Sequence, residues 1–202
     1  MEDNKRIALV LFAKVPGLGI AKSRIAAQSD AHTAATAYAE LLDVVSGVLR
    51  GQEYHVSYTG SDAPGPLRRA FPDAASFFPQ PVAPLGERLR AAMHWSTTNG
   101  YLGMIAIGCD CPTLTRNDID TARHALTDGA DVVLGPAEDG GYYLAGCTAR
   151  GAVIFSARQW SSPGLFAETL EIVRREKLVH RLLDRRADID TLADYTRWKE
   201  TP

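Results

Sequence analysis

The sequence is poor in cysteine and has no large excess of either charge. Its three cysteines, two of them one residue apart, make a poor disulfide framework, so we expect reduced thiols and a cytoplasmic protein. The 22 basic and 24 acidic residues leave a formal net charge of -2, which argues against a nucleic-acid-binding protein. No apolar run approaches the roughly 20 residues of a membrane span, and the run after Lys5 and Arg6 is too short for a signal-peptide core.

Several catalytic and metal-binding patterns are also missing. The five histidines are scattered without metal-ligand or triad spacing, and no G-x-S-x-G motif supports a serine hydrolase. Cys109 and Cys111 lack the second cysteine or histidine pair that would complete a zinc site, so we interpret them as small buried hydrophobes. The 202 residues, 46% of them hydrophobic, fit one compact domain over residues 1–202.

Short apolar runs alternate with amphipathic stretches along the whole chain. Strands are expected at residues 7–12, 54–58, 76–78, 104–107, 131–134, 142–145 and 178–183. Helices are expected at residues 30–49, 67–70, 85–93, 115–126, 166–174 and 192–198. This alternation predicts an α/β protein whose mostly parallel sheet is covered on both faces. Residues 142–145 follow a glycine turn, which predicts a locally mixed sheet.

The first strand runs directly into a basic loop. Six consecutive apolar residues, Ile7 to Phe12, are typical of a strand buried on both faces. Lys14, Lys22 and Arg24 then follow within one glycine-containing loop. Because ligands of open α/β sheets bind beyond the carboxyl ends of the strands, this loop predicts a phosphate site. The alternative is an ordinary surface turn with scattered lysines.

This loop does not match either common phosphate-binding motif. Ala21 stands where the nucleoside-triphosphatase loop requires a glycine before Lys22 and Ser23. Gly17 and Gly19 begin a dinucleotide fingerprint, but Lys22 replaces its last glycine.

Two aspartates are candidates for binding a divalent cation. Asp110 follows the buried strand at residues 104–107, and its oxygens are the hard ligands that magnesium prefers. The alternative, that Asp110 caps the next helix, is weakened because Thr115 already fills that position. Asp190 precedes a capping box of Thr191 and Asp194, so it either supplies a second metal ligand or is a helix-entry acid.

A glycine turn follows the strand at residues 131–134. Gly140 and Gly141 would let the backbone approach a ligand closely, and Asp139 could contact a sugar, an acceptor or metal-bound water. The alternative is a plain Asp-Gly hairpin turn, and the residues alone leave both interpretations open.

Four ordered motifs together resemble a bacterial glycosyltransferase-A-like family. They lie at residues 12–24, 108–114, 131–144 and 188–191, so the resemblance spans nearly the whole chain. The first motif is similar to the family pattern F-A-K-x-P-x-P-G-x-x-K-T-R. The family is related to the guanylyltransferases that act on phospholactate or phosphoenolpyruvate in deazaflavin-cofactor synthesis.

The resemblance implies a three-layer α/β/α sandwich with a Rossmann-like sheet, the fold of the nucleotide-diphospho-sugar transferases. It implies that Asp110 and Asp190 bind Mg²⁺ or Mn²⁺, and that Asp139, Gly140 and Gly141 lie on the acceptor side. The matching nucleotide and phosphate contacts are Phe12, Ala13, Lys14, Gly19, Lys22, Ser23 and Arg24. The catalytic residues that it predicts are Lys22, Asp110 and Asp139.

Several activities share this set of residues. We expect a metal-dependent transferase with a nucleotide or nucleotide-sugar donor and a small acceptor. Glycosyl transfer is favoured because the stretch 138–143 resembles the glycosyltransferase-like subfamily more than the guanylyltransferases. The alternatives are a guanylyltransferase-like nucleotidyl transfer to a phosphorylated acceptor and a non-catalytic nucleotide-binding domain. The sequence does not identify the base, the sugar or the acceptor, and it leaves a homodimer open.

Overall fold

Strand β1 (Ile7–Lys14) lies in the interior of the sheet, and its residues Ile7 to Leu11 are all buried. The structure, a computed structural model, describes residues 6–17, 21–61 and 63–200. β1 pairs in parallel with β2 (His55–Thr59) on one side and β4 (Gly103–Ile107) on the other. A strand enclosed by neighbours and by helices on both faces needs a continuous apolar run, as predicted.

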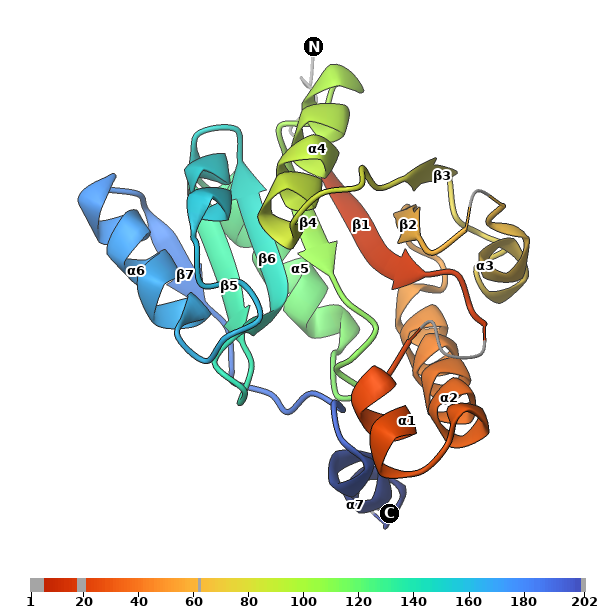
Figure 1. Cartoon of the computed structure of the whole chain (residues 1–202). Helices are drawn as coiled ribbons and strands as arrows, with labels where there is room; N and C mark the ends of the chain where they lie inside the picture. Colours follow the sequence, from red (N-terminus) through yellow and green to blue (C-terminus); the bar gives the residue numbers. More distant parts are fainter. Residues whose placement is uncertain (1–5, 18–20, 62, 201–202) are drawn as a thin grey trace.

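The sheet has seven strands among the described residues, and it is mixed (Figure 1). Only β6 (Tyr142–Thr148) runs antiparallel to its neighbours, β4 and β5 (Val132–Pro136), because a tight hairpin joins it to β5. The predicted local mixing is therefore confirmed. The order of the strands is β3 (Ser76–Pro79), β2, β1, β4, β6, β5 and β7 (His180–Leu182).

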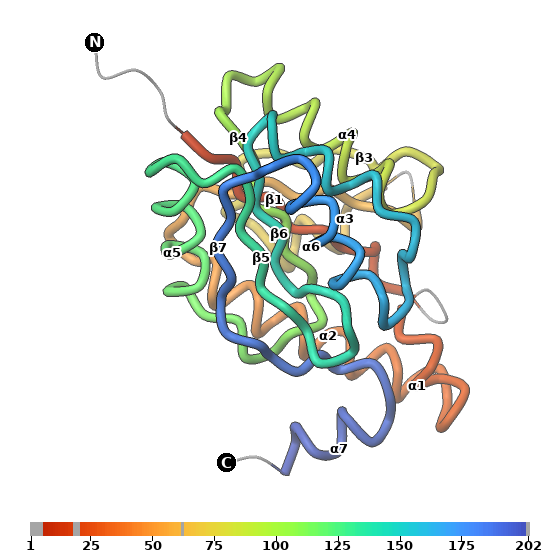
Figure 2. Tube along the Cα trace, turned by 90° about the vertical axis from the view of Figure 1, so that its left-hand side faces the viewer, coloured from red at the N-terminus to blue at the C-terminus, as the bar shows by residue number. Residues whose placement is uncertain are grey.

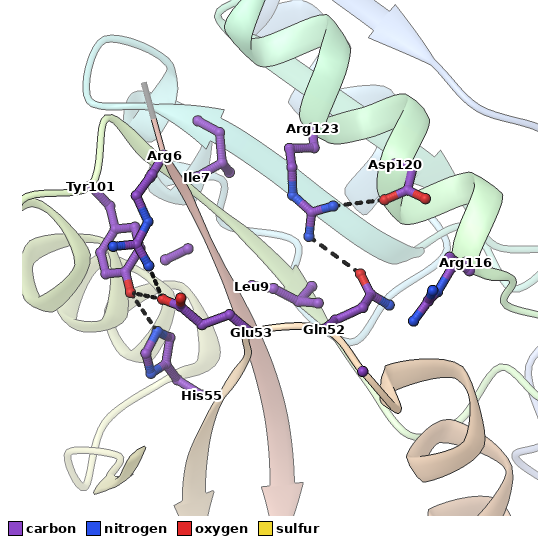
Figure 3. A pocket seen from close by; sticks show the side chains of 12 residues that line it. Arg6, Ile7, Leu9, Gln52, Glu53, His55, Tyr101, Arg116, Asp120 and Arg123 are labelled. Atoms are coloured by element: carbon purple, nitrogen blue, oxygen red, sulfur yellow. Dashed lines mark hydrogen bonds and ion pairs between the residues drawn. The ribbon is translucent and has the colours of Figure 1, made fainter. Parts of the chain in front are cut away.

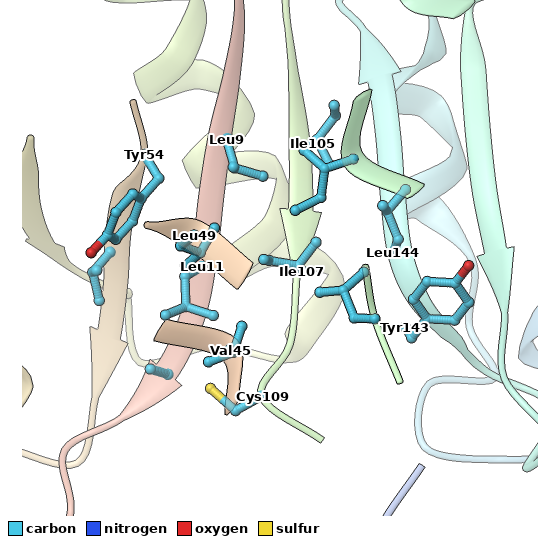
Figure 4. Packing of buried hydrophobic residues seen from close by; sticks show 14 of the residues in the cluster. Leu9, Leu11, Val45, Leu49, Tyr54, Ile105, Ile107, Cys109, Tyr143 and Leu144 are labelled. Carbon is cyan, nitrogen blue, oxygen red and sulfur yellow. The ribbon is translucent and has the colours of Figure 1, made fainter. Parts of the chain in front are cut away.

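Alternate residues of β1 face two different helical layers. Leu9 and Leu11 pack against α2 (Ala31–Leu49) and α5 (Arg116–Thr127), in the cluster that Figure 4 shows. Ala8 and Val10 face α4 (Leu85–Thr98), the 3₁₀ helix η1 (Gly151–Ser156) and α6 (Leu165–Arg175). This arrangement is the predicted three-layer α/β/α sandwich.

The expected helix starts are present. The Asp30 carboxylate caps α2 by accepting from the amides of His32 and Thr33 at 2.7 and 2.9 Å. Thr115 and Asp118 form the predicted capping box at the start of α5. Helix α3 (Gly65–Ala70) is also present.

Two short helices escaped prediction, η1 and α1 (Ser23–Gln28). Helix α1 buries only Ile25, so its sequence has no apolar periodicity to recognise. Helix α1 lies beside α7 (Leu192–Glu200) near the carboxyl ends of the parallel strands (Figures 1 and 2). Among the described residues, no helix is both long and apolar enough to cross a membrane.

Candidate functional site

The predicted site residues come together at the carboxyl edge of the sheet. Lys14 ends β1, Asp110 follows β4, and Asp139 lies in the hairpin between β5 and β6. The segment 183–191 runs along β5 toward the same edge and carries Asp190 there. The fold thus joins four distant parts of the sequence in one region.

Lys22 is the most enclosed cation of this region. Its side chain is only 5% exposed, and its ammonium nitrogen lies 2.6 Å from Asp110 Oδ1 and 4.0 Å from Asp190 Oδ1. The same ammonium donates a hydrogen bond to the carbonyl oxygen of Ile189. Lys22 also has left-handed backbone angles, φ 55° and ψ 43°, which cost a residue with a Cβ roughly 1 kcal/mol. The chain therefore holds Lys22 against the two carboxylates that were predicted to bind metal.

Arg24 completes this ion-pair cluster. Its Nη1 donates to Asp190 Oδ2 at 2.9 Å, while its side chain remains 66% exposed. Asp190 therefore contacts two cations of the basic loop. In this structure both Lys22 and Arg24 face carboxylates, and their predicted contacts with phosphate stay predictions.

A backbone hydrogen bond fixes the aspartates of the C-terminal segment beside Asp110. The amide of Ile189 donates to the carbonyl of Asp110 at 2.8 Å. The Ile189 side chain is buried in a small apolar cluster that contains Ile25 and Leu41. Asp188 and Asp190, the neighbours of Ile189, are held at the site by this anchor.

Asp188 is a site residue that sequence reasoning missed. Its Oδ1 is buried and has no hydrogen-bond partner among the described residues. Burial raises the pKa of Asp188 to about 7, and the negative charges of Asp110 and Asp139 add to this effect. Burial also raises the pKa of Asp190, against the opposing effect of Lys22. The signal in the sequence is the Asp-x-Asp spacing, which puts Asp188 and Asp190 one residue apart.

Asp139 shapes its own turn as well as facing the cluster. Its Oδ1 accepts from the amide of Gly141 at 2.8 Å, which is the hairpin-turn role that the alternative interpretation described. Gly140 has a φ of +89°, and a Cβ there would lie 2.2 Å from the Pro163 carbonyl oxygen. Asp139 is nevertheless close enough to raise the pKa of Asp188. The turn therefore requires a glycine at position 140, and it places the Asp139 carboxylate near Asp188.

Tyr38 of α2 fixes the backbone of Lys14 at the start of the basic loop. The Tyr38 hydroxyl accepts from the amide of Lys14 at 2.8 Å and donates to its carbonyl at 2.9 Å. Burial raises the pKa of Tyr38 far above its usual value, so the hydroxyl keeps its proton. The Lys14 side chain is exposed and has no ion-pair partner among the described residues. It therefore remains available to an anionic ligand.

The other predicted contacts lie along the same loop. Ala13 is buried, and the carbonyl of Phe12 accepts a weak hydrogen bond from Cys109 Sγ at 3.6 Å. Ser23 is exposed at the start of α1, and Gly19 lies outside the described residues. Phe12 and Ala13 have no charged side chain, so their role would be to position the backbone of the loop.

The cysteines belong to the core. Cys109, Cys111 and Cys147 are free and buried, and burial raises the pKa of each thiol. The prediction that Cys109 and Cys111 are buried hydrophobes is confirmed.

The acidic side chains fit a hard divalent cation. Within the described residues, no three histidine, cysteine, aspartate or glutamate side chains are arranged as a complete metal site. Magnesium, however, commonly uses only one or two carboxylates together with substrate phosphates. Asp110 and Asp190 supply such oxygens, and the unpartnered Oδ1 of Asp188 is a buried acceptor that lacks a positive partner. Lys22 fills the place between Asp110 and Asp190 in this structure.

Solved structures with the same fold support the architecture. A candidate nucleotide-diphospho-sugar transferase from Desulfovibrio desulfuricans G20 is 28% identical with a TM-score of 0.85, and the match covers 96% of this chain and 87% of that chain. A cytidylyltransferase from Leptospira borgpetersenii serovar Hardjo-bovis has 14% identity, a TM-score of 0.62 and coverages of 98% and 86%. Rv0371c from Mycobacterium tuberculosis H37Rv, in complex with manganese, has 16% identity, a TM-score of 0.60 and coverages of 98% and 100%.

The chain has the nucleotide-diphospho-sugar transferase fold that the sequence motifs predicted. No curated protein matches the sequence. The sequence model of a family described as "Uncharacterized protein conserved in bacteria (DUF2064)" matches residues 45–162. This bacterial family is the one to which the chain belongs.

Proposed function

We propose that the protein is a metal-dependent transferase that uses a nucleotide-activated donor, with glycosyl transfer as the leading reaction. One observation carries this proposal: the carboxylates of Asp110, Asp188 and Asp190 converge with the cations of the basic loop at the carboxyl edge. Ligands of open α/β sheets bind at this edge. The fold shared with the Desulfovibrio protein supports a nucleotide-sugar donor.

We assign the basic residues to the donor phosphates and the acidic residues to the metal and the acceptor. Lys14, Lys22 and Arg24 would bind the donor diphosphate, and stabilising its leaving charge is the main catalytic task of such a site. Asp110 and Asp190 would hold Mg²⁺ or Mn²⁺, with Asp188 as a further acceptor. The cation, when bound, would neutralise phosphate charge. Asp139 would face the acceptor.

Lys22 cannot bind the carboxylates and a donor phosphate at the same time. Its ammonium is enclosed between Asp110 and Asp190 and is almost inaccessible, so a phosphate cannot reach it there. We therefore propose that Lys22 exchanges its carboxylate partners for phosphate when the donor and metal are both present. Arg24, which is largely exposed, can contact phosphate with a smaller movement.

Nucleotidyl transfer is the second candidate. It would use the same cations and carboxylates but release pyrophosphate rather than a nucleoside diphosphate. The fold shared with the Leptospira cytidylyltransferase supports nucleotidyl transfer as an alternative. A non-catalytic nucleotide-binding domain would need the cations, but it would not need three aspartates gathered around one of them.

A binding and product experiment tests the proposal. Nucleoside triphosphates and nucleotide-sugars are screened by thermal shift with and without Mn²⁺, since a ligand of the folded state raises its melting temperature. Phosphorus NMR then identifies the released group with candidate acceptors. We expect metal-dependent stabilisation by at least one donor, and a nucleoside diphosphate as product for glycosyl transfer. Pyrophosphate as the product would select the nucleotidyl alternative.

Asp110→Asn is the informative variant, and Asp43→Asn is its matched control, because Asp43 is exposed on α2. We expect Asp110→Asn to remove the Mn²⁺ dependence of donor binding and Asp43→Asn to keep it. If no donor stabilises the protein in the presence of Mn²⁺, or if Asp110→Asn keeps full metal dependence, the proposed function is wrong.

A further inference from the structure

A ligand-sized cavity lies at the end of the sheet opposite the candidate active site. It has a volume of about 490 Å³ and is lined by the start of β1, the start of β2 and one side of α5 (Figure 3). Ile7 lines it, whereas Lys14 of the same strand belongs to the candidate active site. Seven residues of strand separate the two, which is about 23 Å at the usual rise per residue. The two places are therefore distinct.

One wall of this cavity is a closed polar network. Arg6 pairs with Glu53, and the Tyr101 hydroxyl donates to Glu53 Oε1 at 2.7 Å. His55 Nε2 lies 2.9 Å from the Tyr101 oxygen, and burial lowers the pKa of this histidine. One cation and one carboxylate balance each other on this wall.

The opposite wall, on α5, has an excess of positive charge. Arg123 pairs with Asp120 at 2.7 Å and also donates to Gln52 Oε1 at 3.3 Å. Arg116 donates to the carbonyl of Arg50 but has no carboxylate partner within the described part of the chain. The cavity wall therefore has one unbalanced guanidinium group.

The position of Arg116 is not one that helix stability favours. Arg116 is the first residue of α5, where the helix dipole is positive and acidic side chains are preferred. Its charge adds to the positive potential at this end of the helix, which the Asp118 carboxylate of the same turn, itself paired with Arg186, offsets only in part. The chain as a whole has a net charge of -2, so this potential is local.

The floor of the cavity is apolar. Ile7 and Leu9 line it, but these residues are only 6% and 1% exposed, so they offer little surface to a ligand. A volume within the usual range of ligand pockets, an apolar floor and a few convergent polar groups are the features of a small-molecule site. We propose that this cavity binds a small organic anion, whose carboxylate or phosphate group faces Arg116 and Arg123.

The test uses phenyl phosphate and benzoate as anionic probes and benzyl alcohol as the neutral comparator. They are titrated into isotopically labelled protein without metal or nucleotide, so that the result is independent of the proposed transferase activity. We expect saturable NMR shifts at the arginine side chains of α5 and at Tyr101 with an anion, and none with benzyl alcohol. Phenyl phosphate binding alone would identify a phosphate site, and benzoate binding would identify a carboxylate site.

Arg116→Gln is the decisive variant, and Arg174→Gln, an exposed arginine of α6, is its control for the loss of one charge. Removing a charged hydrogen-bond partner should weaken anion binding at least about tenfold in Arg116→Gln and leave it unchanged in Arg174→Gln. The exposed position of Arg116 keeps the variant folded, which circular dichroism checks. Equal losses in both variants, shifts confined to the carboxyl edge, or no saturable shift with either anion would overturn the proposal.

Discussion

The ammonium group of Lys22 lies 2.6 Å from the carboxylate of Asp110; the Lys22 side chain is almost inaccessible to solvent, whereas that of Asp110 is about half exposed. Asp110 also faces the negative charge of Asp190 across this ammonium. Opposite charges at such distances attract by several kcal/mol at the effective dielectric of a protein surface, before solvent screening is counted. The chain thus supplies its own cation to carboxylates that we propose as metal ligands.

Lys22→Met should increase the affinity for Mn²⁺ in the absence of nucleotide. The substitution removes the ammonium that competes for Asp110 and Asp190, and it keeps a similar length and the same left-handed backbone cost. We expect an increase of about tenfold, the size of one strong charge pair after partial screening. Isothermal titration calorimetry with Mn²⁺ alone measures it.

Lys14→Met is the matched control, because Lys14 belongs to the same loop but has an exposed side chain. It removes the same charge without freeing a carboxylate, so its Mn²⁺ affinity should change much less. Unchanged or weaker Mn²⁺ binding by Lys22→Met would show that Lys22 does not compete with the metal.

Ile189→Ala tests the anchor of the C-terminal aspartates. The side chain is 4% exposed in its apolar cluster, so its truncation should lower the free energy of unfolding by about 3 kcal/mol. The substitution keeps the Ile189 amide but removes the side chain that holds it against the Asp110 carbonyl, so we expect weaker Mn²⁺ binding as well. Urea denaturation and calorimetry measure the two effects.

Val179→Ala is the control for this variant, since Val179 is 59% exposed and its truncation should change stability by less than about 0.5 kcal/mol. If Ile189→Ala is destabilised but keeps full Mn²⁺ affinity, the Ile189 side chain does not position the aspartates that bind the metal.

The fold and the edge that carries the site could be predicted because they depend on local patterns. The apolar run of β1 and the capping box of Thr115 and Asp118 are legible in a single sequence. They place the basic loop and Asp110 at strand ends, and the topology of α/β sheets then brings these ends together.

The partners within the site could not be predicted, because they depend on long-range geometry. Nothing local to Lys22 indicates that its ammonium contacts Asp110 and the Ile189 carbonyl. Asp188 differs from Asp190 in its burial and in having no cation against its Oδ1, and both differences follow from how the segment after β7 packs. The cavity at the opposite end of the sheet also combines residues of four separate segments.

The buried His55 should contribute a loss of stability as the pH drops below about 6.5, whereas Asp188, whose pKa burial raises to about 7, contributes in the opposite direction. His55 is 6% exposed beneath Trp95, and burial lowers its pKa, with Arg6 acting in the same direction and Glu53 opposing it. The unfolded chain therefore binds a proton that the folded chain resists, so acid favours unfolding. One such proton contributes a slope of at most about 1.4 kcal/mol per pH unit.

His55→Gln should flatten this slope, because an amide has no proton to gain in this range. Its side chain can still hydrogen-bond to Ser76 and Tyr101, which contact the two ring nitrogens in the native protein. Urea denaturation at about pH 7.5 and about pH 5.5 gives the difference for each protein. His94→Gln, on the exposed face of α4, serves as the control, and equal slopes for His55→Gln and the native protein would contradict the prediction.

Gly140→Ala should destabilise the turn that presents Asp139. The added Cβ would meet the Pro163 carbonyl oxygen at 2.2 Å, and the residue has a φ of +89°. The steric clash and the backbone strain together should lower the free energy of unfolding by about 3 kcal/mol. Gly129→Ala is an internal control, since its φ is +106° but its Cβ would meet nothing within 4 Å.

Gly129→Ala should therefore show only the backbone cost of about 1 kcal/mol, and the difference between the two variants reports the contact with Pro163. This contact matters for the site because the carbonyl of Gly140 accepts from the Phe166 amide at 2.9 Å, which fixes the turn against the start of α6. Urea denaturation measures both variants. If they lose the same stability, Pro163 yields easily, and the position of Asp139 is then set by its own hydrogen bond to Gly141 rather than by the packing of the turn.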